Sequence, residues 1–274
     1  MRRRHCIVAL GAALAAPALL AQERSALERV RQRGSLIVGL YHDMPPFHVK
    51  AEGIDVDLAK ALAAQLGVGL TMLPFQADEN MADDLRNVVW RGHYLGWGPA
   101  DVLMHVPVER HLMDANPRVQ IIAPYYRERV AIARRRDALP VLDSLSALRG
   151  HAVAVAGQSL AGWLLIGADG GALRDTLLTR WPDGVAAATA LRDGQVVAAA
   201  GLASELEHVL ANDARFAIEA LPAPRAPRDG WAVGCAVNKD FRDLALALQQ
   251  AMQTLNESSQ LRSMFEQRGV RWRL

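Results

Sequence analysis

The chain has 274 residues, of which 51% are hydrophobic and 22% are charged. This composition is ordinary for a globular protein, and the length suits one large domain or two moderate ones. The formal net charge of +2 gives no sign of the strongly basic surface of a nucleic-acid-binding protein, so we expect no nucleic-acid partner.

The N-terminus has the layout of a cleavable secretory signal. Three arginines at residues 2–4 precede an apolar run over residues 6–20, and Ala21 then offers a small residue for cleavage. The apolar run is too short for a comfortable membrane span, and no cysteine follows it that could carry a lipid. We therefore expect residues 1–21 to be a signal peptide and the mature protein to lie in the periplasm.

Removal of the signal changes both the charge and the cysteine count. The mature chain would hold 28 basic and 29 acidic residues, and Cys235 would be its single cysteine. A lone cysteine cannot form an internal disulfide, so the fold must depend on its own core. Because Cys235 lies in the apolar run 231–237, we interpret it as a small buried hydrophobic residue.

The first half of the chain alternates strands with helices. Ser25 can cap a short helix that ends at Gly34, and further helices are expected over residues 58–66 and 83–90. Prolines are expected to interrupt the chain at residues 45–46 and again at residues 124–126. The expected strands cover residues 36–40, 69–74, 101–106 and 130–133. Strands that alternate with helices in this way predict a parallel sheet with crossover helices.

The second half repeats the same order of elements. The expected strands cover residues 152–155, 186–190, 196–200 and 231–237. The expected helices cover residues 144–148, 173–181, 205–211, 241–255 and 259–268, and another begins at Leu160. Residues 222–227 form a proline-rich connector with turn or extended character.

Two such units predict a two-lobed α/β fold in which each lobe is a mostly parallel sheet flanked by helices. The last part of the chain is expected to return to the first lobe. We expect residues 26–126 and 231–274 to form the first lobe and residues 127–230 to form the second. The chain would then cross between the lobes twice, at hinge segments near residues 126–133 and 222–231.

Several segments, taken in order, resemble the family 3 periplasmic solute-binding proteins, which are the binding components of polar amino-acid uptake systems. They are the Pro-Pro-Phe loop at residues 45–47, Gly-x-Asp-x-Asp-Leu-Ala at 53–59, the strand end and arginine at 106–110, Ala-Pro-Tyr-Tyr at 123–126, Gly-Gln-Ser at 157–159, and Gly-x-Ala-Val from Gly234. The resemblance implies a type II periplasmic-binding-protein fold, a small polar or carboxylate ligand, and a membrane ABC permease as partner of a monomer.

A looser similarity in overall layout is to the branch of this family that accompanies periplasmic quinoprotein alcohol dehydrogenases. The segment over residues 83–101 is longer than the corresponding passage of the amino-acid binders. An accessory protein of a periplasmic dehydrogenase therefore stays open as the alternative function.

Arg110 is the first candidate for a ligand-binding residue. In open parallel sheets, ligands bind outside the carboxyl ends of the strands, and the loops expected there cover residues 41–47, 105–110 and 157–159. A guanidinium binds a carboxylate through two parallel hydrogen bonds and keeps its charge. The resemblance implies this role for Arg110, since the matching arginine of the family grips the carboxylate of the ligand. The alternative is a surface salt bridge with Glu109 or Asp114.

Five further residues complete the candidate ligand site. Gln158 and Ser159 begin a helix directly after a strand, where amides and polar side chains suit an anionic or polar group, although Ser159 could instead only cap that helix. Tyr41 and Phe47 could wall the cleft or pack in the core. His105 lies in the second of the candidate loops.

One departure from the family pattern bears on the ligand. Amino-acid binders usually place an aspartate after the second-lobe strand, where it pairs with the ammonium group. Here Gly201 and Leu202 follow that strand, and Glu205 is the nearest carboxylate. An ammonium group without such a partner would be desolvated with poor compensation. A plain carboxylate or a neutral polar molecule is therefore as good a candidate as an amino acid.

The sequence favours neither a metal site nor catalysis. Two histidine pairs, His42 with His48 and His105 with His111, have a spacing of six, which is not a standard ligand pattern. Some proteins of this fold eliminate water or carboxylate from cyclic acids, but a dehydratase needs a positioned acid or base. The available candidates, Glu109, His105 and Glu205, form no triad or carboxylate pair, so we expect no enzyme and no cofactor.

Overall fold

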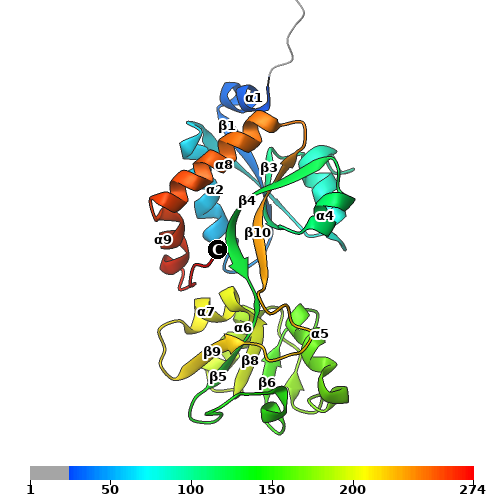
Figure 1. Cartoon of the computed structure of the whole chain (residues 1–274), viewed down its shortest axis with the longest axis vertical. Helices are drawn as coiled ribbons and strands as arrows, with labels where there is room; N and C mark the ends of the chain where they lie inside the picture. Colours follow the sequence, from blue (N-terminus) through cyan, green and yellow to red (C-terminus); the bar gives the residue numbers. More distant parts are fainter. Residues whose placement is uncertain (1–24) are drawn as a thin grey trace, which may run out of the picture.

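The computed structural model describes residues 25–274. The expected signal peptide, residues 1–21, lies outside the described residues. The described chain forms two sheets of five strands each, one above the other in Figure 1. We call the sheet that contains β1 and its helices the first lobe, and the sheet that contains β5 and its helices the second lobe.

Each sheet is parallel except for one strand. The first sheet has the order β2 (Gly69–Phe75), β1 (Ser35–Tyr41), β3 (Val102–Pro107), β10 (Trp231–Asn238) and β4 (Val119–Glu128). The second has the order β7 (Leu177–Leu178), β6 (Val153–Val155), β8 (Ala198–Leu202), β5 (Val130–Arg135) and β9 (Phe216–Ala220). β10 and β5 run antiparallel to both of their neighbours. The predicted fold class, two mostly parallel sheets, is confirmed.

Helices cover both faces of each sheet. In the first lobe, the helices are α1 (Ala26–Arg33), α2 (Ile54–Gln65), α8 (Arg242–Glu257) and α9 (Gln260–Gln267) on one face, and α3 (Met81–Asp84), η1 (Leu85–Trp90) and α4 (Arg110–Ala115) on the other. In the second lobe, they are η2 (Leu145–Leu148), α5 (Leu160–Ile166) and η3 (Ala168–Gly171) on one face, and α6 (Gly184–Arg192) and α7 (Ala203–Leu210) on the other.

The two-sided burial of β1 explains why its sequence is a continuous apolar run. Successive side chains of a strand point to opposite faces. Leu36, Val38 and Leu40 therefore enter the core beneath α2 and α8, while Ile37 and Tyr41 pack against the core beneath η1. Burial of Leu36 and of Leu40 contributes about 2 kcal/mol each, which holds the layer of α2 and α8 to this strand.

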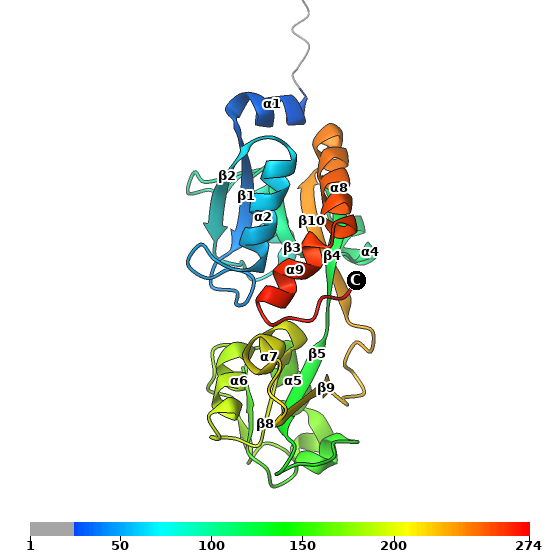
Figure 2. The ribbon, with the colours of Figure 1, turned by 90° about the vertical axis from the view of Figure 1, so that its left-hand side faces the viewer.

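Two chain segments join the lobes. Only Arg129 separates β4 from β5, and Figure 2 shows these strands passing from one lobe into the other. The return segment over residues 221–230 ends at Gly230, whose φ is 64°. A Cβ atom on Gly230 would lie 1.8 Å from the carbonyl oxygen of Glu128. The two segments can therefore lie against each other only because residue 230 has no side chain.

Three expectations about single elements were wrong. Residues 124–126 do not interrupt the chain, because Pro124 lies in the edge strand β4 opposite a register shift, where a missing N–H is tolerated. Residues 186–190 belong to α6 rather than to a strand. Residues 177–178, expected within a helix, instead pair with β6 as β7. The sequence also did not predict α4 or β9.

Candidate functional site

A cavity of about 430 Å³ opens on the second lobe where α5, α6 and α7 begin. These helices start near the carboxyl ends of the parallel strands, which is where ligands bind in open α/β sheets. We call this the second-lobe cavity. Its lining comes from the second lobe alone and consists of residues 156–159, Thr179, residues 181–184 and Glu205.

Gln158 and Ser159, both predicted from the sequence, line this cavity together. The Ser159 hydroxyl donates to the carbonyl of Ala156 (2.7 Å) and accepts from the backbone N–H of Gly162 (3.1 Å), so it caps α5. Gln158 is exposed, and its side chain has no hydrogen-bond partner among residues 25–274. Gln158 is therefore the more available of the two for a ligand.

Glu205 supplies the carboxylate of the cavity. Its two oxygens accept hydrogen bonds from the backbone N–H groups of Gly184 (3.0 Å) and Leu202 (2.7 Å), at the first turns of α6 and α7. Burial raises the pKa of Glu205 to about 7, although the two amide hydrogen bonds act in the opposite direction. The carboxylate therefore changes its charge close to neutral pH.

Two glycines make room for this carboxylate. A Cβ atom at Gly184 would lie 2.1 Å from Oε2 of Glu205, and one at Gly201 would lie 2.9 Å from the same oxygen. Gly201 lies within β8, rather than after the strand as the sequence suggested. The absence of a side chain at Gly201, where the sequence seemed to lack an acidic partner, allows the side chain of Glu205 to reach the cavity.

Trp181 and Asp183 also line the cavity, and the sequence did not single them out. The indole N–H of Trp181 is buried without a hydrogen-bond partner among the described residues, and the Arg180 guanidinium lies 4.5 Å from the ring centroid. Asp183 accepts from the backbone N–H of Ala186 (2.7 Å) and caps α6. The run Trp-Pro-Asp-Gly before an alanine-rich segment was the available signal for a helix start.

Arg110 lies on the other lobe, as the first residue of α4. It is exposed, and neither Glu109 nor Asp114 forms an ion pair with it; no partner for its guanidinium is present within the described chain. In Figure 1, α4 of the first lobe and α5 of the second lie on the same side of the hinge strands. Arg110 is thus an unengaged cation of the first lobe, and the structure does not bring it into contact with the second-lobe cavity.

Tyr41 is tied into a polar network of the first lobe. Its hydroxyl donates to Oδ2 of the buried Asp84 (3.0 Å), and its ring packs 4.7 Å from the ring of Phe75. Burial raises the pKa of Tyr41, and burial also raises the pKa of Asp84 to about 6. The phenol therefore acts as a neutral donor that holds the end of β1 to α3.

Phe47 and His105 are core residues in this structure, with exposed fractions of 1% and 8%. Their ring centroids lie 4.1 Å apart. Asp55 accepts from the Tyr125 hydroxyl (2.7 Å) and lies 3.2 Å from Nδ1 of His105. His105 to Pro107 belong to β3 rather than to a loop, so their place in the sheet turns His105 toward the core.

No group of three or more histidine, cysteine, aspartate or glutamate side chains that could hold a metal ion occurs within residues 25–274. No helix in the same range is long and apolar enough to span a membrane. The second-lobe cavity presents the Glu205 carboxylate, the Gln158 amide and backbone groups, which can form ionic contacts and hydrogen bonds.

Neither the models of known protein families nor the curated protein sequences match this chain. Solved structures do match it. An ancestral cationic amino-acid solute-binding protein matches with a TM-score of 0.68 and 19% identity, over 89% of this chain and 100% of that one. A second structure of that protein, described as a precursor of cyclohexadienyl dehydratase, gives a TM-score of 0.59 with 19% identity, over 90% and 100% of the two chains.

Two further matches come from bacteria. A substrate-binding protein of an amino acid ABC transporter from Streptococcus pneumoniae, bound to L-arginine, has a TM-score of 0.61 and 20% identity, over 90% of this chain and 98% of that one. The L-cystine solute receptor of Neisseria gonorrhoeae, in its unliganded open conformation, has a TM-score of 0.61 and 22% identity, with the same coverage of 90% and 98%. The chain therefore has the two-lobed fold of the periplasmic binding proteins.

Proposed function

We propose that this protein is a periplasmic solute-binding protein that captures a small amino acid or a related carboxylic acid and delivers it, as a monomer, to a membrane ABC permease. The observation that carries the proposal is the second-lobe cavity, where Gln158 and Glu205 lie at the helix starts that face ligands in this fold. Among the matched structures, the Streptococcus pneumoniae protein is bound to L-arginine, and two proteins of Neisseria gonorrhoeae are solute receptors for L-cystine and L-cysteine. These ligands support the amino-acid class.

Each lobe supplies one half of the recognition. The Arg110 guanidinium, exposed and without a partner among residues 25–274, is suited to the carboxylate of the ligand. The Glu205 carboxylate, which keeps unused lone pairs after accepting two amide hydrogen bonds, is suited to its ammonium group. A molecule that engages both would bridge the lobes and stabilise their closed arrangement.

Isothermal calorimetry against a panel of amino acids, each paired with its analogue that lacks the amino group, tests this proposal. We expect one amino acid to bind with a Kd in the micromolar range, equivalent to about 8 kcal/mol. Arg110→Ala should then weaken binding at least tenfold. Arg149→Ala is the matched control, because Arg149 is an exposed second-lobe arginine paired with Asp169 (3.1 Å) outside the cavity.

Two results would count against the proposal. Unchanged affinity in Arg110→Ala would remove Arg110 from the site. Tighter binding of the analogue without an amino group would remove Glu205 as the ammonium partner and favour a plain carboxylate ligand.

Binding without catalysis is the second part of the proposal. Among the described residues that line the cavity, Glu205, with a pKa of about 7, and Asp183 carry the carboxyl groups, and Asp183 is engaged as a helix cap. A dehydratase would need that acid to protonate a leaving group. Incubation with prephenate and related cyclic acids, followed by absorbance, should show no turnover, and turnover that is lost in Glu205→Gln would replace the binding role with an enzymatic one.

A further inference from the structure

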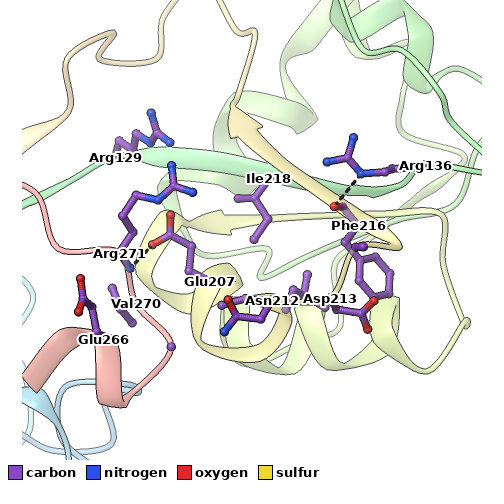
Figure 3. Close-up of a pocket in the computed structure, with 14 residues that line it drawn as sticks. Arg129, Arg136, Glu207, Asn212, Asp213, Phe216, Ile218, Glu266, Val270 and Arg271 are labelled. Atoms are coloured by element: carbon purple, nitrogen blue, oxygen red, sulfur yellow. Dashed lines mark hydrogen bonds between the residues drawn. The ribbon is translucent and has the colours of Figure 1, made fainter. Parts of the chain in front are cut away.

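A larger cavity, of about 680 Å³, lies on the other side of the hinge strands from α4 and α5. We call it the rear cavity. Figure 3 shows its walls: the C-terminal end of α7 with the loop that follows, the strands β5 and β9, and the chain after α9. The second lobe supplies most of the lining, and the segment over residues 266–271 closes one side. The amino-acid site proposed above uses none of these residues.

Three arginines line the rear cavity: Arg129, Arg136 and Arg271. Their guanidinium groups have no carboxylate partner within the described chain. The Arg136 side chain donates only through Nε, to the carbonyl of Phe216 (3.1 Å). The Arg271 side chain has no hydrogen bond within the described chain, whereas its backbone N–H donates to Oε2 of Glu207 (3.0 Å). Figure 3 shows the guanidinium groups of all three at the cavity.

Two of the three carboxylates at the cavity are already neutralised. Glu207 forms an ion pair with Arg273, and Asp213 forms one with Arg215 (2.6 Å). Glu266 is exposed on α9 and has no partner in the described chain. The positive charge of the three arginines is therefore only partly balanced.

Arg129 gives the most specific evidence that the rear cavity binds a hydrogen-bond acceptor. Its Nε–H is buried and has no hydrogen-bond partner among the described residues. A buried donor of a charged group that is left unsatisfied is costly, and such groups in native proteins commonly have an ion or a water as their partner. An acceptor that enters the cavity would remove this cost.

We infer that the rear cavity is a binding site for a multivalent oxyanion of the phosphate type. A planar guanidinium fork matches the geometry of phosphate oxygens, and three such groups require a ligand with more than one negative charge. The volume of about 680 Å³ exceeds the needs of a single phosphate, so a diphosphate, free or as part of a larger molecule, fits the site better.

A ligand in this position would connect the two lobes. Arg136 belongs to the second lobe, Arg129 lies in the hinge between β4 and β5, and Arg271 follows α9 of the first lobe. An oxyanion held by all three would stabilise the contact that the C-terminal segment already makes with α7 through Glu207.

Isothermal calorimetry and thermal unfolding of the full mature chain with inorganic pyrophosphate and with orthophosphate test the inference. All samples are brought to the same ionic strength with sodium chloride, because nonspecific attraction to arginines is screened by salt. We expect saturable binding of pyrophosphate, tighter than that of orthophosphate, and a rise in Tm that follows its concentration. Arg271→Gln and Arg129→Gln should each lower the affinity for pyrophosphate at least fivefold.

Arg149→Gln is the control, since Arg149 is exposed and paired with Asp169 away from the cavity, and it should bind pyrophosphate like the unaltered protein. Arg271 is exposed, so Arg271→Gln tests the site even if the Arg129 variant fails to fold. Equal binding by Arg271→Gln, or a thermal shift that chloride reproduces at equal ionic strength, would overturn the inference. Amino-acid binding is measured on the same variants, and it should be unchanged in Arg271→Gln, so a failure of either site is recognised separately.

Discussion

At the level of single residues, the protonation of Glu205 is the most informative property of the second-lobe cavity. Burial favours the neutral carboxyl, whereas the amides of Gly184 and Leu202 favour the charged form, and burial has the larger effect because the pKa rises to about 7. An ordinary glutamate of an unfolded chain titrates near 4.5. Glu205 therefore links folding to pH across the range between these two values.

The sign of this linkage gives a first prediction. Between about pH 4.5 and pH 7, the folded protein binds more protons at Glu205 than the unfolded chain does, so the free energy of unfolding should fall as the pH rises. The expected loss is about 3 kcal/mol across this window. Urea unfolding from pH 5 to pH 8 measures it. Glu205→Gln should flatten the curve, whereas an unchanged slope in that variant would assign the pH dependence to other groups, such as Asp84 with its pKa near 6.

The close approach of Gly184 to Glu205 gives a second prediction. Gly184→Ala places a methyl group where Oε2 now lies, at 2.1 Å, so it should destabilise the protein by about 1 to 3 kcal/mol and weaken ligand binding. In the background of Glu205→Ala the same change should cost much less, because the clashing atoms are gone. A double-mutant cycle by chemical denaturation measures this coupling, and additive effects of the two substitutions would show that the clash is relieved elsewhere.

At the level of elements, the C-terminal segment after α9 joins the two lobes. The Arg127 backbone N–H donates to the carbonyl of Arg273 (2.9 Å), and the Trp272 indole donates to the carbonyl of Tyr125 (2.9 Å). The Arg273 guanidinium pairs with Glu207 of α7 and also donates to the Tyr126 hydroxyl. The last residues of the chain thus hold α7 of the second lobe against β4 of the first.

The buried ion pair at this junction gives a third prediction. Glu207 is 6% exposed, so removal of Arg273 would leave its carboxylate buried and unpaired. Arg273→Ala should therefore lower the free energy of unfolding by about 3 kcal/mol. Arg149→Ala, which breaks an exposed pair, should cost about 1 kcal/mol or less. Urea denaturation of both variants makes the comparison, and equal losses would mean that the Glu207 carboxylate finds another partner.

The helices and strands also show which parts of the fold could be predicted from the sequence. Ser25 as a cap, Gly34 as a helix end and the apolar runs of β1 and β10 were correctly placed, because capping and burial on both faces leave local patterns. α6 was taken for a strand because its alanines carry no periodic signal, and only the Asp183 cap and the packing beneath β8 identify it as a helix.

At the level of the whole molecule, the lobes are joined by two chain segments and by the contact of the C-terminal segment with α7. The two segments touch at Gly230 and Glu128, and Glu128 is fully buried, where it accepts from the Ser204 hydroxyl of α7. Burial raises the pKa of Glu128. The hinge therefore has a packed interior, about which the lobes would move as rigid units.

Ligand-driven closure gives a fourth prediction. If the ligand bridges Arg110 and Glu205, small-angle X-ray scattering should record a smaller radius of gyration when the amino acid found by calorimetry is added at saturation. Arg110→Ala at the same ligand concentration should stay at the larger value of the free protein. A radius that does not change on saturation of the unaltered protein would show that binding occurs without closure.

The sequence by itself determined the class of fold, the order of most strands and helices, and the polar loop of Gln158 and Ser159, because these depend on local capping and on the periodicity of burial. Only the tertiary structure decided that Phe47 and His105 lie in the core, that Glu205 reaches the cavity past Gly184 and Gly201, and that three arginines line one cavity behind the hinge. These outcomes depend on which segments, far apart in the sequence, pack together. Local sequence patterns do not specify such long-range contacts.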